Sequence, residues 1–391
     1  MQSYDVVIVG GGVMGSSVAY FLKGPVGFSG SVLVVERDPT YADGATPRSA
    51  GGIRQQFSTP ENIRMGQFGA SFIKNVAGHL AVDDDAPQLP FVENGYLFLA
   101  SGAGMGILRA NYETQKSLGA DNVLLSANEL RQRFPWMNVE ELAGGCYGLS
   151  NEGWTDPYGL LQAFRRKARA LGVTYLADTV TGLKRDGNRV VSVATKENGT
   201  IACGAVVNSS GYWAREIAAT IGIDLPVHPR KRLVYVFDCR EQLGRVPLTI
   251  EPNGVWFRPE GGSYICGVSP EESDDPDCTD FEIDYMLYEE LIWPTIANRV
   301  PAFEAIKLTR AWAGHYDYNT LDQNAIIGPH PEIGNFYFCN GFSGHGLQQS
   351  PAIGRATAEL ITYGAYKSID LTRFGFERVL RNEPLREINV V

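Results

Sequence analysis

The sequence lacks the signatures of several classes of protein. It has no CxxC pair and no cluster of cysteines with histidines, so we expect no structural zinc and no other bound metal. No apolar run approaches the length of a membrane span. The net charge of −10 argues against nucleic-acid partners, which require a concentrated basic surface. The acidic segment PEESDDPDC (270–278) lacks the ligand order of an EF-hand, so we expect a solvated loop there.

Disulfides are not expected either, although six cysteines are present. A chain of 391 residues can bury a large core without covalent staples. The first residues, MQSYDVVIVGGG, contain no basic region and no cleavable apolar segment. We therefore expect a reduced protein of the cytoplasm.

The strongest positive signal lies near the N-terminus. An apolar run, residues 6–9, is typical of a buried parallel strand. Gly10, Gly12 and Gly15 then form a GxGxxG pattern at the start of a helix. In a βαβ unit, these glycines permit a tight turn, the approach of a pyrophosphate and close helix packing. Glu36 ends the next strand about 20 residues later, where an acid accepts hydrogen bonds from ribose hydroxyls, so the unit predicts dinucleotide binding.

Similar strand-to-glycine signals recur at 201–213 and 326–355, and the intervening segments resemble antiparallel sheet. The sequence therefore predicts an α/β fold with a discontinuous Rossmann-type cofactor domain and a substrate domain built on a mainly antiparallel sheet. The cofactor domain is expected at residues 1–80, 148–218 and 318–391, and the substrate domain at residues 81–147 and 219–317.

Five segments together resemble the FAD-dependent D-amino-acid oxidase superfamily, and within it the sarcosine oxidase and glycine oxidase branch. They are VGGGVMG (9–15), GGIR (51–54), NSSGYWA (208–214), RAWAGHYDYNTLDQNAIIG (310–328) and GFSGHGLQQSPAIGR (341–355). The resemblance covers nearly the whole chain and implies a GR2-like FAD-binding domain. The last two segments are also similar to a subgroup of FAD oxidoreductase-domain proteins that includes a mitochondrial assembly factor for a respiratory complex.

The resemblance implies hydride transfer from the α-carbon of an amine to flavin N5, followed by hydrolysis of the imine to glyoxylate or an aldehyde plus an amine. We expect an oxidase of small secondary or primary amino acids, such as sarcosine, glycine or iminodiacetate, that reduces O2 to H2O2. One alternative is a dehydrogenase that uses another electron acceptor. A second alternative is a flavin-bearing assembly or scaffold protein with little turnover.

The resemblance also indicates which residues contact FAD. Backbone N–H groups and the helix dipole near residues 343–348 are expected to stabilise negative charge on the reduced flavin. His345 is interpreted as part of this scaffold, with a direct electrostatic role as the alternative. The expected FAD contacts are Gly10, Gly12, Val13, Met14, Gly15, Glu36, Arg37, Arg48, Ser49, Ala50, Gly51, Gly52, Val180, Ser210, Gly211, Trp213, Gly341, Ser343, Gly344, His345, Gly346, Leu347 and Gln348.

The resemblance makes Arg54 the expected ligand of the substrate carboxylate, since an arginine at the matching position has this role in sarcosine oxidases; its planar fork suits bidentate recognition. The alternative for Arg54 is a surface salt bridge. Sarcosine oxidases carry a lysine at the position of Gln348, so a charge that helps to hold the carboxylate is missing here. The lysine that these enzymes use in oxygen activation aligns with Ile265, which weakens the expectation that O2 is the electron acceptor.

Covalent attachment of FAD is not expected. The cysteine that ties the flavin in sarcosine oxidases aligns with His315, and a histidine that serves this purpose near Ser49 in a related branch is also missing. His315 is instead a candidate to bind a carboxylate or hold a hydroxyl near neutral pH. The side chains expected to line the substrate cavity are His315, Tyr316, Trp256 and Tyr264, with core packing as the alternative for the aromatic residues.

Overall fold

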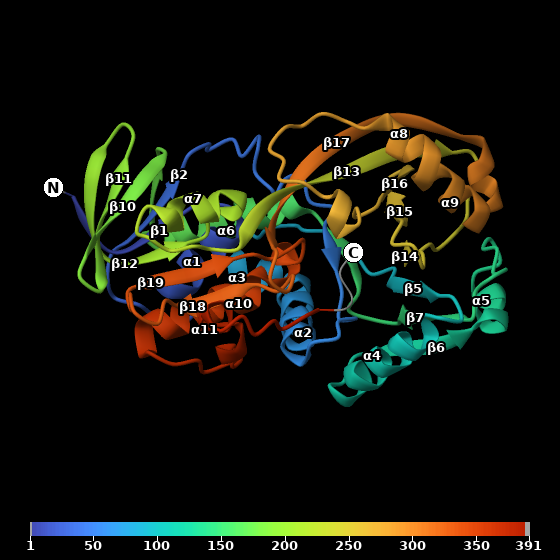
Figure 1. Ribbon diagram of the computed structural model, residues 1–391, viewed down its shortest axis with the longest axis horizontal. Coiled ribbons are helices and arrows are strands. Elements are labelled where there is room, and N and C mark those ends of the chain that lie inside the picture. Colours follow the sequence, from blue (N-terminus) through green and yellow to red (C-terminus); the bar gives the residue numbers. More distant parts are fainter. Residues whose placement is uncertain (1, 388–391) are drawn as a thin grey trace.

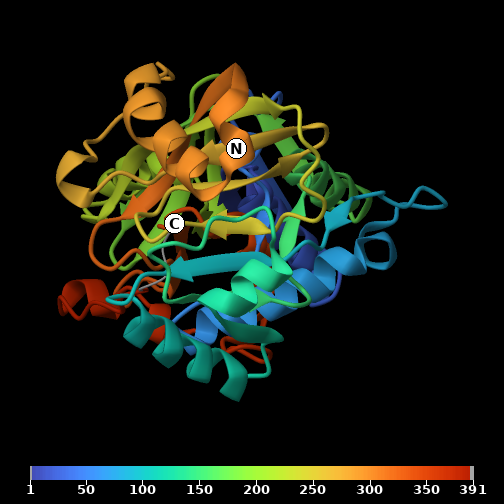
Figure 2. The same cartoon turned by 90° about the vertical axis from the view of Figure 1, so that its right-hand side faces the viewer.

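The computed structural model describes residues 2–387. Figure 1 shows two large sheets toward opposite ends of the molecule, and Figure 2 looks at the end that carries the second sheet. The first sheet has a parallel centre in which β1 pairs with β2 and β12. Its strands run in the order β10 (Val180–Asp186), β11 (Arg189–Thr195), β12 (Gly199–Asn208), β1 (Ser3–Val9), β2 (Val32–Glu36) and β9 (Thr174–Ala177), with β19 (Phe336–Asn340) beside β12 and β18 (Ile326–Pro329) beside β19.

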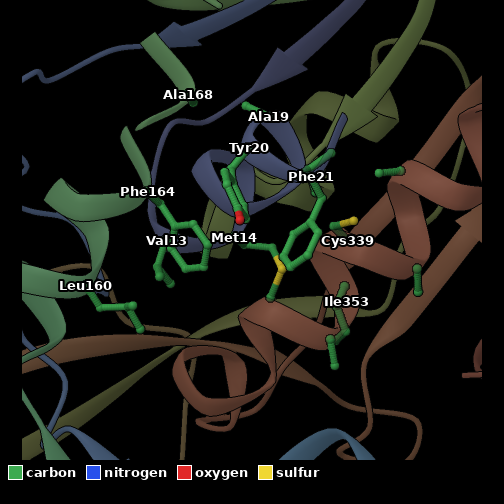
Figure 3. Packing of buried hydrophobic residues seen from close by; sticks show 14 of the residues in the cluster. Val13, Met14, Ala19, Tyr20, Phe21, Leu160, Phe164, Ala168, Cys339 and Ile353 are labelled. Carbon is green, nitrogen blue, oxygen red and sulfur yellow. The ribbon is translucent and has the colours of Figure 1, made fainter. Parts of the chain in front are cut away.

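The apolar run of β1 is explained by burial of the sheet on both faces. Val6 and Ile8 pack into one hydrophobic cluster, whereas Val7 and Val9 pack into another on the opposite face. Helices α1, α2, α6 and α10 contribute to the first cluster, and α7 contributes to the second. Figure 3 shows Met14 of α1 in the first cluster, together with side chains of other helices such as Phe164 and Ile353.

Close packing positions the helices that cover the first sheet. Helix α1 contacts both α6 and α10, and α10 also contacts α2. Gly354 of α10 lies so close to α1 that an added Cβ would fall 2.1 Å from the Oγ atom of Ser17. The α-helices of both halves of the molecule, within residues 2–387, are α1 (Val13–Lys23), α2 (Pro60–Lys74), α3 (Val76–Leu80), α4 (Met105–Ser117), α5 (Ala127–Arg133), α6 (Pro157–Ala170), α7 (Ala214–Ala219), α8 (Tyr285–Leu287), α9 (Trp293–Arg299), α10 (Gly346–Tyr363) and α11 (Glu377–Leu380).

The second sheet is antiparallel except where β14 pairs with β5. Its two longest strands, β13 and β17, also contact the short helix η1 (Gly211–Trp213) beside the first sheet. They therefore connect the two halves of the molecule (Figure 1). The strand order is β17 (Ile306–Asn319), β13 (Val227–Cys239), β16 (Ser263–Gly267), β15 (Trp256–Glu260), β14 (Leu248–Ile250), β5 (Tyr96–Ala100), β7 (Gly144–Gly148) and β6 (Asn122–Ser126).

A small third sheet joins the two halves, in the order β3 (Gly52–Ile53), β8 (Gly153–Thr155) and β4 (Phe91–Val92). The predicted fold class, a Rossmann-type α/β unit with a mainly antiparallel second sheet, is confirmed. The predicted division into domains at residues 80, 147, 218 and 317 stays a prediction. Within residues 2–387, no helix is long and apolar enough to cross a membrane.

Candidate cofactor and substrate site

A cavity of about 440 Å³ lies between the carboxyl ends of β1 and β2 and the strands of the second sheet. This edge of a parallel sheet is where ligands bind in doubly wound folds. Most of the predicted FAD contacts line the cavity. They are Gly10, Gly12, Val13, Met14, Glu36, Arg37, Arg48, Ser49, Ala50, Gly52, Val180, Ser210, Gly211, Trp213, Gly344, His345, Gly346, Leu347 and Gln348.

The N-terminal glycines have different surroundings. Gly10 adopts a φ of +94°, which favours glycine. An added Cβ at Gly15 would fall 2.0 Å from the carbonyl oxygen of Gly10, so this glycine allows α1 to pack on β1. At Gly12, by contrast, an added Cβ would meet only the Oγ1 atom of Thr46, at 3.5 Å. The space at Gly12 is therefore open toward the cavity, as a bound pyrophosphate requires.

Glu36 lies at the end of β2, where it faces the cavity. Its carboxylate accepts hydrogen bonds from the N–H groups of Gly11 and Asp38, at 2.7 and 2.9 Å. Burial raises the pKa of Glu36, and these N–H donors oppose that rise. The carboxylate oxygens retain further lone pairs that fit the ribose hydroxyls of a dinucleotide. The guanidinium of Arg37 lies 3.2 Å from the ring centre of Trp213 and closes this end of the cavity.

The segment beside the expected flavin position is held from the second sheet. Arg48 donates from Nη1 to the carbonyl oxygen of Ala313 at 2.7 Å, and its own carbonyl oxygen accepts from Trp312 at 2.9 Å. Arg258 donates to the carbonyl oxygen of Ala50 at 2.5 Å. The wall of the cavity at residues 48–52 is thus fixed by strands β15 and β17, which belong to the other half of the molecule.

Four predicted FAD contacts do not line the cavity, so their contact with FAD stays a prediction. Gly15 is packed against Gly10, as described above. Gly51 has a φ of +78°, and an added Cβ would fall 2.3 Å from the carbonyl oxygen of Thr155. Gly341 and Ser343 lie behind the wall, where Ser343 Oγ accepts a hydrogen bond from the backbone of β17. These residues shape the wall and do not face its interior.

Arg54 follows β3, lines the cavity and is only 3% exposed. Its guanidinium lies 4.4 Å from the ring centre of Phe57 and 5.2 Å from that of Phe98. Burial lowers the pKa of Arg54, but a guanidinium stays charged in proteins. The alternative of a surface salt bridge is wrong, because the side chain is a buried cation.

Two residues at the start of α10 contact Arg54. Arg54 Nη2 donates to Nε2 of His345 at 3.0 Å, and the backbone N–H of Arg54 donates to Oε1 of Gln348 at 2.7 Å. Burial and the charge of Arg54 hold the pKa of His345 well below its ordinary value. His345 is therefore neutral with its proton on Nδ1, which suits a scaffold role better than proton transfer.

Of the aromatic residues predicted for the substrate cavity, some line the cavity and one lies in the core. Tyr316 and Trp256 line the cavity, and Gly344 lets the Tyr316 ring approach the loop before α10. Tyr264 does not line it, which corrects that prediction. Its ring packs in the core of the second sheet, 5.4 Å from the ring of Phe237 and 5.0 Å from that of Phe303.

His315 lines the cavity and is 2% exposed. Within residues 2–387, neither ring nitrogen has a well-formed hydrogen bond, although the backbone of Asp280 is close enough to favour the protonated form. Burial is the larger effect and lowers the pKa of His315, so the ring is neutral near pH 7. Phe281 packs edge-on to this ring, with 4.7 Å between ring centres.

Tyr96 and Asp317 are among the cavity residues that sequence reasoning missed. The hydroxyl of Tyr96, on β5, lies so close to Gly52 that a Cβ added there would be only 1.9 Å away. Nothing in the residue pattern of β5 marks Tyr96 as a site residue. Asp317 accepts from the N–H of Gly341 at 2.9 Å, and burial raises its pKa to about 7. A carboxylate within the apolar pattern of β17, two residues after His315, was an available signal.

The acidic segment is only partly solvated, which corrects that expectation. Asp275 is buried and binds Arg232 through two hydrogen bonds of 2.8 and 2.7 Å. The neighbouring Lys231 pairs with Asp280 at 2.7 Å. The segment after β16 is thus tied to β13, and it packs Phe281 against the ring of His315.

Residues 5–360 match a protein-family model described as FAD dependent oxidoreductase. The chain therefore belongs to this family, which confirms the predicted superfamily. The cofactor of the family is FAD. It is 46% identical to FAD-dependent oxidoreductase domain-containing protein 1 of Xenopus laevis, over 99% of this chain and 85% of the relative. The mitochondrial sarcosine dehydrogenase of Mus musculus is 26% identical over 95% of this chain and 41% of the relative.

A solved structure agrees with the fold. L-proline dehydrogenase from P. horikoshii is similar with a TM-score of 0.87 and 26% sequence identity, over 98% of this chain and 99% of that chain. The open space at Gly12, the acceptor at Glu36 and the helix start at Gly346 all lie along one cavity. These features fit FAD: the residues around Gly12 would hold its pyrophosphate, and the start of α10 would face its ring.

Proposed function

We propose that the protein is an FAD-dependent oxidase of small secondary or primary amino acids, of the sarcosine, glycine or iminodiacetate type. The observation that carries this proposal is the position of Arg54. It is a buried cation on the cavity wall, in contact with the same turn of α10 that is assigned to the flavin ring. A buried guanidinium recognises a carboxylate strongly, because little water competes for its donors.

The residues of this site orient an amino acid and protect it from water. Arg54 binds the carboxylate, and Tyr96, Tyr316 and Trp256 form aromatic walls around the remainder. Only the neutral amine can release a hydride, and a cation close to the amine lowers its pKa, so Arg54 favours the reactive form. FAD, when bound, supplies the acceptor of that hydride.

A dehydrogenase with another electron acceptor is the second candidate, and Ile265 favours it. This residue occupies the position of the oxygen-activating lysine and is 1% exposed, packed among apolar residues that include Val234 and Val236. No cation at that position assists oxygen. Two of the similar proteins are dehydrogenases by name.

Anaerobic mixing of the flavin-loaded protein with a panel of amino acids tests the proposal. A substrate should bleach the flavin absorbance, and we expect small secondary amino acids to bleach it fastest. Rapid recovery of colour with formation of peroxide on admission of air supports the oxidase, whereas slow recovery supports the dehydrogenase. Absence of bleaching by every amine would overturn both and favour the assembly or scaffold alternative.

Noncovalent binding of FAD is part of the proposal and gives a separate prediction. His315 stands at the position of the linking cysteine, so acid precipitation is expected to release all of the yellow colour into the supernatant. The absorbance of pellet and supernatant measures the distribution. A yellow pellet would show a covalent link and contradict the prediction.

A cytoplasmic location also belongs to the proposal. Because one similar protein is mitochondrial by name, the location needs its own measurement. Cell fractionation followed by detection with an antibody is expected to place the protein in the cytoplasmic fraction, and recovery in another compartment would overturn this part.

A further inference from the structure

Gln348, which stands where sarcosine oxidases carry a lysine, uses its amide oxygen within the protein. Its Oε1 atom accepts a hydrogen bond of 2.7 Å from the backbone N–H of Arg54. Arg54 follows the short strand β3, whose pairing with β8 ends at Ile53, so its N–H requires another acceptor. Both residues are buried, with 3% of Arg54 and 4% of Gln348 exposed. A buried N–H that loses its acceptor retains the full cost of desolvation.

The same turn of α10 also holds the side chain of Arg54. Nε2 of His345 accepts from Arg54 Nη2 at 3.0 Å, and the His345 ring packs edge-on against Phe57 with 5.1 Å between ring centres. Phe57 in turn lies beneath the Arg54 guanidinium. One helical turn therefore fixes both the backbone and the guanidinium of Arg54.

Helix α2 presses these two segments together. An added Cβ at Gly66 would fall 2.4 Å from the carbonyl oxygen of Arg54, and one at Gly69 would fall 2.1 Å from that of Gln348. These two glycines lie three residues apart, on one side of the helix. The close approach of α2 leaves little freedom for either backbone to shift.

We propose that Gln348 is a positioning residue, which holds Arg54 by its backbone N–H so that the guanidinium faces the substrate carboxylate. This inference rests on the proposed role of Arg54 as the carboxylate ligand. It also explains why a neutral amide occupies the position: the contact requires an acceptor, and a lysine ammonium has only donors.

The substitution Gln348→Met tests the contact, because it keeps the length of the side chain and removes the acceptor. Gln349→Met is the matched control. Gln349 is also buried in α10, but its amide donates to Asn62 at 3.0 Å and does not line the cavity. Gln348→Glu keeps an acceptor and is the conservative rescue.

The first measurement is hydrogen–deuterium exchange of the Arg54 amide, read from overlapping peptides that span residues 51–57. We expect exchange about tenfold faster in Gln348→Met than in the wild type, and unchanged in Gln349→Met and Gln348→Glu. Equal exchange in all four proteins would overturn the contact. This result does not depend on catalysis, so it decides the contact even if no amino acid is oxidised and the proposed function fails.

The second measurement is steady-state kinetics with the best substrate of the panel. Gln348→Met is expected to raise KM about tenfold with a smaller change in kcat, and Gln349→Met is expected to change neither. Faster exchange together with an unchanged KM would overturn the positioning role while leaving the hydrogen bond in place.

Discussion

Replacement of Arg54 by alanine is expected to raise KM for amino-acid substrates by about 30-fold or more. Truncation of a buried, hydrogen-bonded charge in a charge pair costs about 2–5 kcal/mol, and each 1.4 kcal/mol is about tenfold in affinity. The measurement is the concentration dependence of flavin bleaching. Arg54→Lys is expected to recover only part of the affinity, since an ammonium keeps the charge but loses the planar fork.

Arg299→Ala is the control for loss of a buried arginine. Arg299 pairs with Glu251 at 2.9 Å and does not line the cavity. This variant should lower the melting temperature but leave KM unchanged. An unchanged KM in Arg54→Ala would remove Arg54 from the substrate site and, with it, the main support for the proposed function.

The second large effect is expected at Gly12. Gly12→Val places a side chain in the open space assigned to the pyrophosphate, so the affinity for FAD should fall about 10- to 100-fold. The apoprotein should nevertheless fold, with a melting temperature within a few degrees of the wild type, because an added Cβ meets only Thr46, at 3.5 Å. Titration of the apoprotein with FAD, followed by flavin fluorescence, measures the affinity.

Gly15→Ala gives the contrasting result. Its Cβ would fall 2.0 Å from the backbone of Gly10, so the packing of α1 on β1 should fail and the apoprotein itself should be destabilised. If Gly12→Val binds FAD as tightly as the wild type, the space at Gly12 does not hold the pyrophosphate. If it unfolds as Gly15→Ala is expected to do, the assignment of the two glycines is wrong.

The N-terminal unit could be predicted from sequence because its determinants are local. The valines of β1 are buried on both faces, Gly15 packs against Gly10 a few residues away, and Glu36 ends the adjacent strand. Each of these features depends on spacing along the chain, which a sequence displays directly. The glycine-rich segment before α10, by contrast, is assigned to the site by the resemblance to the family.

Other residues were misjudged because long-range contacts decide their roles. Tyr264 alternates with Ile265 along β16, and only the packing of the sheet shows that Tyr264 faces the core. Asp275 lies in an acidic run that reads as solvated, yet the position of Arg232 on β13 buries it in an ion pair. Neither the packing of Tyr264 nor the ion pair of Asp275 can be predicted from spacing along the chain.

The sequence by itself determined the family, the Rossmann-type cofactor unit and the presence of an arginine, a histidine and a glutamine near the flavin position. Only the tertiary structure decided what these three residues contact. Arg54 and Gln348 are 294 residues apart, and α2 brings their backbones together through its two glycines. The amide oxygen of Gln348 accepts a hydrogen bond from the backbone N–H of Arg54. This N–H needs such a partner because β3 ends in the interior of the protein, just before Arg54.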